Sequence, residues 1–250
     1  MIQMSLRYAL PFLFALTSPV AALELEAMTD AERAAFRAEV RAYLLEDPEV
    51  LQEAIGVLLE RERLAEIAND QLLAVTYADE LFNDRHSYVG GNPAGDITIV
   101  EFMDYRCGYC KRAYTEVEAL LAADANIRFI VKEYPILGEQ SVLASRFAVA
   151  TQLVAGDDAY KAVHDTLMEF RGDITQASMT RLAEILELDA EAIIAQMDSS
   201  EVTNIIAANR ALGDQMEISG TPTFVIEDQM LRGYVPADAM VAIIAELREE

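Results

Sequence analysis

The two cysteines of this 250-residue chain lie three positions apart, in the motif Cys107-Gly108-Tyr109-Cys110. The apolar, β-branched residues 97–102 ahead of the motif predict a strand, and the apolar residues behind it recur at helical spacing. Cys107 is therefore expected where a strand passes into a helix, beside unpaired backbone N–H groups and the positive end of the helix dipole. Because both stabilise an anion, we expect Cys107 to have a depressed pKa and to act as a nucleophile.

The second cysteine completes a redox pair. Cys110 lies one helical turn further on and can close a disulfide with Cys107 or resolve a mixed one. A zinc site would need two further ligands, and the remaining candidates, His86 and His164, lack metal-ligand spacing. A purely structural disulfide would close a loop too short to constrain the unfolded chain much. We therefore predict thiol–disulfide exchange without an organic cofactor, and Cu(I) held by the same two thiolates stays open.

Residues 1–22 have the pattern of a secretory signal peptide. Arg7 supplies the positive charge, residues 8–16 the apolar core, and Ser18 to Ala22 the small residues for cleavage after Ala22. An uncleaved anchor is the alternative, although the apolar core is short for a membrane span. We predict an exported, periplasmic protein, in a compartment where disulfides persist. The formal charge of −24 disfavours nucleic acid and anionic membranes as partners.

A helical region is predicted over residues 23–85. A capping box begins at Thr29, and Asp47-Pro48 has the pattern of an N-cap followed by a first helical residue. An apolar stripe follows on one side of the second helix, made of Val50, Leu51, Ala54, Ile55, Leu58 and Leu59. The charged residues 60–63 fit a turn or the exposed face of a helix, and the lack of Gly and Pro from there to Val89 favours one long helix or two collinear ones. The stripe must pack on the next domain or on copies of itself.

The remaining residues predict an α/β domain. Residues 83–96 are rich in turn formers and are predicted to be the boundary. Strands are then expected at 97–102, 127–134, 221–227 and 230–234, a helical block between about 138 and 213, and a last helix at 236–248. This order describes a small mixed sheet with a helical insertion.

Two separated motifs carry a family resemblance. Glu-Phe-x-Asp-Tyr-x-Cys-x-x-Cys-Lys at residues 101–111 and Gly-Thr-Pro-Thr-Phe at residues 220–224 resemble the thioredoxin-fold thiol–disulfide oxidoreductases of the DsbA type. The resemblance implies a thioredoxin-like catalytic domain at 86–250. It also implies a cis Thr221–Pro222 bond facing the dithiol, with backbone groups of Thr221 offered to an extended substrate. An ordinary turn proline is the alternative.

The same resemblance assigns roles to three further residues. Glu101 occupies the position of a buried acid beneath the dithiol, where it would exchange a proton with Cys110 and where burial would raise its pKa. Lys132 lies on the neighbouring strand, where the family can place a charge partner. For both residues the alternative is a side chain that simply points outward. Tyr109, between the cysteines, is expected to tune the redox potential and to contact substrate.

The N-terminal part carries a narrower resemblance. Residues 41–51 and the following Glu53-Ala54-Ile55 are similar to the N-terminal region of the ScsC group, DsbA-like proteins linked to copper tolerance. That group can trimerise through this region and act as disulfide isomerases. The resemblance thus implies a homo-oligomer, a trimer, assembled by residues 23–85. It implies a disulfide isomerase or reductase that acts on cysteines of exported proteins and exchanges electrons with a membrane redox partner. The alternatives are a monomeric DsbA-like oxidase and a Cu(I)-binding copper-tolerance protein that uses Cys107 and Cys110.

Overall fold

The structure is a computed structural model that describes residues 28–249. The predicted signal peptide lies outside the described residues and stays a prediction. The chain divides into two compact units between Glu60 and Arg61. Among residues 28–249, no helix combines the length and apolar character that a membrane crossing requires.

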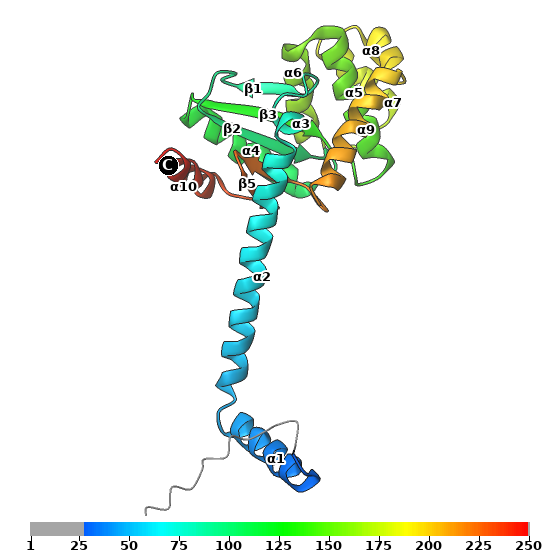
Figure 1. The fold of residues 1–250 in the computed structure, drawn as a ribbon. Helices are drawn as coiled ribbons and strands as arrows, with labels where there is room; N and C mark the ends of the chain where they lie inside the picture. The colour runs from blue at the N-terminus through cyan, green and yellow to red at the C-terminus, as the bar shows by residue number, and fades with distance from the viewer. Residues whose placement is uncertain (1–27, 250) are drawn as a thin grey trace, which may run out of the picture. The chain divides into compact units, whose positions relative to one another are not determined.

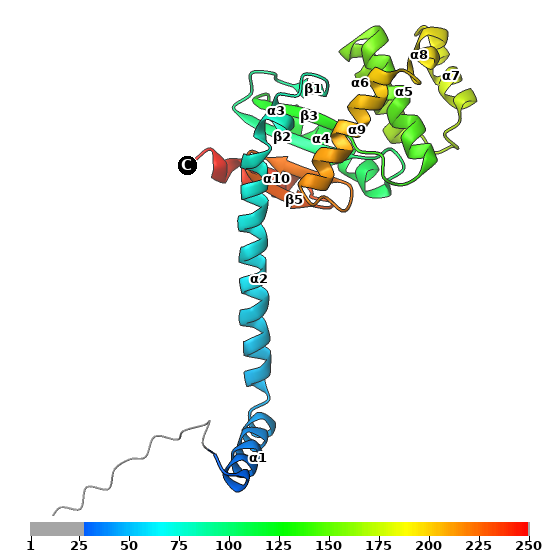
Figure 2. The ribbon, with the colours of Figure 1, turned by 45° about the vertical axis from the view of Figure 1, so that its right-hand side comes forward.

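The first unit contains α1 (Asp30–Glu46) and the beginning of α2 (Glu49–Thr76). The predicted capping box is present, because Thr29 accepts from the Glu32 N–H and the Glu32 carboxylate accepts from the Thr29 N–H. Asp47 is the C-cap residue of α1, and Pro48 lies in the turn between the two helices, so α2 begins one residue later than the sequence predicts. The charged residues 60–63 lie within α2, which is one continuous helix (Figure 2).

The second unit is built on a five-stranded sheet of order β1-β3-β2-β4-β5 (Figure 1). The strands are β1 (Tyr88–Gly91), β2 (Ile97–Met103), β3 (Ile127–Glu133), β4 (Thr223–Ile226) and β5 (Gln229–Arg232). The central strands β2 and β3 are parallel, and the other three neighbouring pairs are antiparallel. The predicted hairpin of β4 and β5 is confirmed, as is the thioredoxin-like fold class.

The interpretation of residues 83–96 as a plain boundary is wrong for Tyr88–Gly91. These four residues form edge strand β1, which pairs with Phe129 and its neighbours on β3. Two glycines hide the strand pattern in the sequence. Gly91 has φ +64°, and a Cβ there would lie 2.4 Å from the Ile127 carbonyl oxygen. Glycine at this position therefore allows both the bend of the chain and the close approach of β1 to β3.

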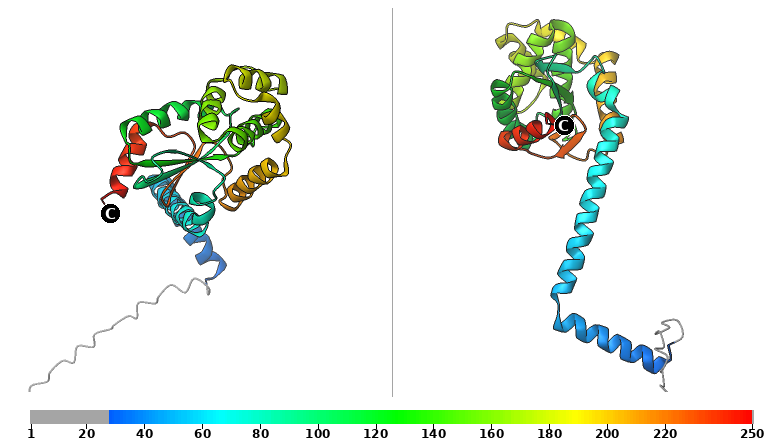
Figure 3. Two further views of the ribbon diagram at one scale, coloured as in Figure 1. Left: turned by 90° about the horizontal axis from the view of Figure 1, so that it is seen from above. Right: turned by 60° about the vertical axis from the view of Figure 1, so that its left-hand side comes forward.

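Helices cover both faces of the sheet (Figure 3). The redox helix α4 (Gly108–Ala123) packs with the C-terminal α10 (Ala237–Leu247), and the short α3 (Ala78–Phe82) contacts β2. The predicted helical insertion is present as five helices, namely α5 (Glu139–Ala155), α6 (Asp157–Glu169), α7 (Gln176–Ile185), α8 (Ala190–Gln196) and α9 (Ser200–Gln215).

Alternate residues of β2 and β3 enter two different apolar cores. Ile99 and Val131 belong to the core that contains α4, whereas Val100 and Ile130 belong to a second core with Ala74, Leu81 and Leu212. Both sheet faces are therefore buried, which is why the sequence of β2 does not alternate.

The end of α2 belongs to the second core and to the second unit. Asp70 of α2 forms a 2.6 Å ion pair with Arg232 of β5. The compact division thus falls after Glu60, whereas the sequence places the domain boundary at 85/86.

Candidate functional site

Cys107 is the N-cap residue of α4, as the strand-to-helix pattern predicts. Its φ of −76° and ψ of 117° are extended, and the Cys110 N–H donates to its sulfur at 3.4 Å. The Cys107 thiol donates to the Thr221 carbonyl oxygen at 3.1 Å. Cys107 is 7% exposed and Cys110 is fully buried, and both are free thiols. The more accessible sulfur therefore sits at the end of the helix dipole.

The two thiols have pKa values shifted in opposite directions. A hydrogen bond from the Cys110 thiol, aided by the Cys110 and Tyr109 N–H groups, lowers the pKa of Cys107 to about 5. Burial, the hydrogen bond to Cys107 and the charge of Glu101 raise the pKa of Cys110 well above its ordinary value. At neutral pH the site thus offers one thiolate nucleophile and one protonated thiol.

Glu101 lies on β2, on the sheet face that packs against α4. It is fully buried, and burial, followed by the charges of Cys107 and Glu133, raises its pKa to about 8. Its Oε1 finds no hydrogen-bond partner among residues 28–249, and Glu101 lines a cavity of about 20 Å³. A cavity of that size holds about one water molecule. The carboxyl thus lies close enough to raise the pKa of Cys110 by its charge, and its proton exchange with Cys110 stays a prediction.

The Thr221–Pro222 loop faces the dithiol. Its peptide bond is cis, and its Thr221 carbonyl receives the Cys107 hydrogen bond. The loop is tied to its surroundings, because the Gly233 N–H donates to the Pro222 carbonyl at 2.9 Å and β4 follows directly at Thr223. Thr221 and Pro222 therefore lie at the redox site, and their contact with substrate stays a prediction.

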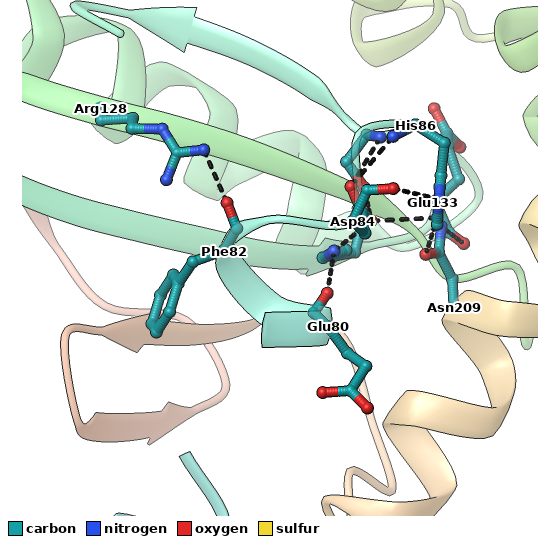
Figure 4. Close-up of polar contacts among 9 residues, drawn as sticks. Glu80, Phe82, Asp84, His86, Arg128, Glu133 and Asn209 are labelled. Carbon is teal, nitrogen blue, oxygen red and sulfur yellow. Dashed lines mark hydrogen bonds and ion pairs between the residues drawn. The ribbon is translucent and has the colours of Figure 1, made fainter. Parts of the chain in front are cut away.

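Lys132 is not brought to the dithiol. It has the same parity on β3 as Ile130 and so points to the second core, opposite to Glu101. The buried ammonium donates to the Glu80 carbonyl at 2.7 Å and pairs with the Asp84 carboxylate. Figure 4 shows Glu80 and Asp84 gathered around this point, with His86 beside Asp84. The prediction that Lys132 is a charge partner of Glu101 is therefore wrong. Successive residues of a strand point to opposite faces of the sheet, and Lys132 and Glu101 lie on opposite faces.

Tyr109 is 60% exposed, beside the nucleophile. The Arg112 guanidinium lies 5.5 Å from the centroid of the Tyr109 ring and 5.5 Å from that of Tyr234. The ring is therefore exposed beside Cys107, and both its contact with substrate and its influence on the redox potential stay predictions.

Asp104 positions the segment that leads into Cys107. Its carbonyl accepts the Cys107 N–H at 3.0 Å, and its carboxylate accepts the N–H groups of Arg106, Ile136 and Leu137. The sequence pointed to this residue only as a member of the motif. A buried acid flanked by four backbone donors fixes the loop and holds the N-cap geometry.

A buried polar cluster next to the site was not predicted. The hydroxyls of Tyr105 and Tyr160 each donate to Glu133 Oε1 at 2.7 Å, and Tyr105 also contacts His164 Nδ1 at 3.1 Å. Burial raises the pKa of Glu133 to about 7 and lowers that of His164 to about 4. Because these residues are distant in sequence, no local signal joins them.

The dithiol supplies donor groups that suit Cu(I). Within residues 28–249, no group of three or more His, Cys, Asp and Glu side chains is placed to hold a metal ion. The two cysteine sulfurs are soft ligands of the kind that Cu(I) prefers. A Cu(I) ion bound at Cys107 and Cys110 would thus share its ligands with the redox chemistry.

Comparison with known families agrees with this geometry. A family model described as a DSBA-like thioredoxin domain matches residues 98–245, which is more than half of the chain. The chain belongs to the DSBA-like thioredoxin domain family. A second model, described as the copper resistance protein ScsC N-terminal domain, matches residues 32–65. The DSBA-like domain is thus preceded by an ScsC-like helical region, and the domain itself is of the thiol–disulfide oxidoreductase type.

Known structures resemble the DSBA-like domain and the region before it. A thioredoxin-like oxidoreductase from Silicibacter pomeroyi DSS-3 is 40% identical, with a TM-score of 0.65, and covers 69% of this chain and 98% of its own. A linker-deletion variant of Proteus mirabilis ScsC is 26% identical, with a TM-score of 0.66, and covers 90% of this chain and 99% of its own.

The first curated relatives are much longer than this chain. The Na⁺/H⁺ antiporter NhaA 3 of Salinispora tropica is 27% identical over 157 residues, which is 63% of this chain and 24% of the antiporter. The chain thus spans about a quarter of that relative.

Proposed function

We propose that this protein is an exported disulfide isomerase or reductase that works as a homo-oligomer on cysteines of other exported proteins. The redox half of the proposal rests on the thiolate of Cys107, and the oligomer rests on an exposed apolar stripe in the first unit. The stripe is the observation that favours an isomerase over a lone oxidase.

The exchange reaction follows from the split pKa values. The Cys107 thiolate attacks one sulfur of a substrate disulfide, forming a mixed disulfide and releasing a substrate thiolate. Cys110 then passes its proton to the Glu101 carboxylate and attacks the Cys107 sulfur. The second substrate thiolate leaves, so two electrons pass to the substrate and the protein holds the Cys107–Cys110 disulfide.

Isomerisation uses the first step alone. When a substrate thiolate, and not Cys110, attacks the mixed disulfide, the substrate gains a new disulfide and Cys107 returns as a thiolate. No net electron transfer occurs, so the protein must start each cycle reduced. The low pKa of Cys107 supports this, because a stabilised thiolate is also a good leaving group.

The stripe of α2 supports assembly. Leu51, Ile55 and Leu58 are 49%, 56% and 54% exposed, and Leu51 borders a groove of about 430 Å³ together with residues of α1. Burial of one such side chain contributes ~1.5–3 kcal/mol, so several per subunit suffice to hold copies together. The ScsC-like match at residues 32–65 covers the same stripe. We propose a trimer formed through residues 23–85.

The test uses the full mature chain with Ile55→Glu and Leu58→Glu combined. Light scattering should show an oligomer for the wild type and a monomer for the double variant. The variant should lose most reactivation of scrambled ribonuclease, yet still reduce a disulfide peptide at the wild-type rate. Both residues are exposed, so the redox domain is expected to fold unchanged.

Val57→Glu is the matched control. Val57 is 53% exposed on the same helix, but at about 100° per residue it faces away from Leu58 and Ile55. It should leave the oligomer intact. A wild-type chain that runs as a monomer removes the isomerase proposal and favours the monomeric dithiol oxidase.

Export is supported by the pattern of residues 1–22. Full-length protein expressed in a bacterium should be recovered from the periplasm without these 22 residues, as mass spectrometry would show. Recovery of the intact chain from the membrane would contradict cleavage.

Cu(I) binding is the second candidate, favoured by the match to a domain named for copper resistance. The mature protein should then take up one Cu(I) per chain, and Cys107→Ser should abolish uptake. Uptake that survives this substitution would remove the dithiol as the Cu(I) site.

A further inference from the structure

A groove of about 660 Å³ opens beside the redox helix. One wall is the first turns of α4, with Gly108, Lys111 and Arg112, and the other is the end of α6 and the segment after it, with Met168, Glu169 and Arg171. Gly108 directly follows the nucleophile Cys107. A chain that entered the groove would therefore lead straight to the reacting sulfur.

The groove is basic, although the chain as a whole carries −24. Three cations and one acid line it, and Arg106, which precedes Cys107, donates to the Gly172 carbonyl at 3.4 Å, next to Arg171. Burial and the charges of Arg106 and Arg171 lower the pKa of Lys111. These cations are thus close enough to repel one another, and a negative group in the groove would relieve that repulsion.

Two of the cations are held in place by the fold. Lys111 donates to the Leu167 carbonyl at 3.2 Å and to the Phe170 carbonyl, which fixes the end of α6 against α4. Arg112 lies against both the Tyr109 and Tyr234 rings. Cations that are already ordered lose little conformational entropy when an anion binds.

We propose that this groove recognises acidic polypeptide segments that flank the reacting cysteine of the substrate. The proposal rests on the exchange activity proposed above and adds its substrate class. A polypeptide is favoured over a small anion because the lining cations come from two separate segments, α4 and the segment after α6, and Arg106 in the loop before α4 lies near them. The groove volume is also that of a site for a ligand much larger than a single anion.

The test compares two peptides with the same internal disulfide, one flanked by glutamates and the other by lysines. Reduced full-length mature protein is mixed with each, and the second-order rate of peptide reduction is measured by fluorescence. The protein dithiol supplies both electrons. Each rate is divided by the rate with dithiothreitol, which removes the intrinsic reactivity of the peptide. We expect the acidic peptide to react about tenfold faster at low ionic strength and the preference to shrink at about 0.5 M salt.

Arg171→Glu should abolish or reverse this preference. Arg181→Glu makes the same charge change at an exposed site on α7 and should preserve it. Arg112→Gln, which keeps the side-chain length close and removes one charge, should reduce it. The compared quantity is the ratio of the two peptide reduction rates within one variant. A change in the Cys107 pKa alters both rates equally, so it cancels in this ratio.

The outcomes separate this inference from the exchange activity itself. Equal rates for both peptides, a faster lysine peptide, or a preference that survives in both groove variants would overturn the groove as the selector. If neither peptide is reduced while dithiothreitol reduces both, the proposed exchange function falls and the groove proposal with it.

Discussion

At the scale of single residues, the site separates two chemically identical thiols by their surroundings. Cys107 at the N-cap receives hydrogen bonds and has a pKa of about 5, whereas Cys110, one turn inside, is buried near a carboxyl and stays protonated. A folded-state pKa below the unfolded value of ~8.5 stabilises the reduced fold. That stabilisation is complete above ~8.5 and is lost as the pH falls through about 5.

Cys110→Ala tests the source of the low pKa. It removes the thiol that donates to Cys107, so the pKa of Cys107 should rise by roughly one unit. It should stay below ~8.5, because the backbone donors and helix dipole remain. A titration of thiolate absorbance measures both values. An unchanged pKa would assign the whole effect to the helix terminus.

Glu101→Gln tests the buried acid. The pKa of Glu101 is about 8 in the folded protein and ~4.3 in the unfolded chain. Between these two pH values the carboxyl ionises in the unfolded chain and stays protonated in the folded protein. Glu101 therefore lowers the stability of the fold more and more as the pH rises from ~4.3 to about 8. The variant should therefore be more stable by about 4–5 kcal/mol at pH 8 and little changed at pH 4. Denaturant unfolding at the two pH values measures this.

The same variant should slow resolution of the mixed disulfide, since the proton of Cys110 loses its acceptor. The lifetime of the mixed disulfide, followed by mass spectrometry, is the readout. A stabilised variant with an unchanged lifetime would leave Glu101 without a part in the chemistry.

At the scale of elements, successive side chains of β3 point into two different apolar cores. Val131 and Glu133 face the redox side, while Ile130 and Lys132 face the core closed by the end of α2 and by α3. Lys132 is fully buried and depends on two partners, the Glu80 carbonyl within α3 and the Asp84 carboxylate just after it. The segment before β1 is therefore bound electrostatically to the centre of the sheet.

Asp84→Asn tests that binding. It leaves a buried ammonium without its counter-charge, which costs about 3–5 kcal/mol. The free energy of unfolding should fall by that order at pH 7, while the Cys107 pKa and the mixed-disulfide lifetime stay unchanged.

Asp79→Asn on the exposed side of α3 is the control and should cost little. A changed lifetime in Asp84→Asn, at temperatures where it is fully folded, would restore a catalytic part for Lys132.

At the scale of the whole molecule, the chain joins a redox domain with a complete core to a helical unit without one. None of the residues of α1 is buried, and α2 buries only Asp70 and Ala74, both at its C-terminal end. Helices with an unburied apolar stripe gain stability by association, and association stabilises only the folded form.

The thermal midpoint of the wild-type protein should therefore rise with protein concentration. The combined Ile55→Glu and Leu58→Glu variant should show a midpoint independent of concentration, because its folded form no longer gains from association. Scanning calorimetry over a hundredfold range of concentration makes the comparison. A wild-type midpoint that does not move would contradict assembly through α2.

The sequence by itself determined the features that depend on neighbouring residues. The N-cap position of Cys107, the capping box at Thr29, the long α2 and the helical insertion follow from turn chemistry and apolar spacing over a few residues. The DsbA-type motif assigned the family, and the ScsC-like stretch assigned the region before it.

Only the tertiary structure decided which distant side chains meet. Lys132 and Asp84, 48 positions apart, form a pair on the face opposite to Glu101, and β1 becomes a strand only because β3 offers its edge. The cluster around Glu133 and the basic groove between α4 and α6 likewise join separate segments. Such contacts depend on which faces of the helices and strands pack together. The pairing energy of buried charges is set by that packing and not by the local sequence pattern.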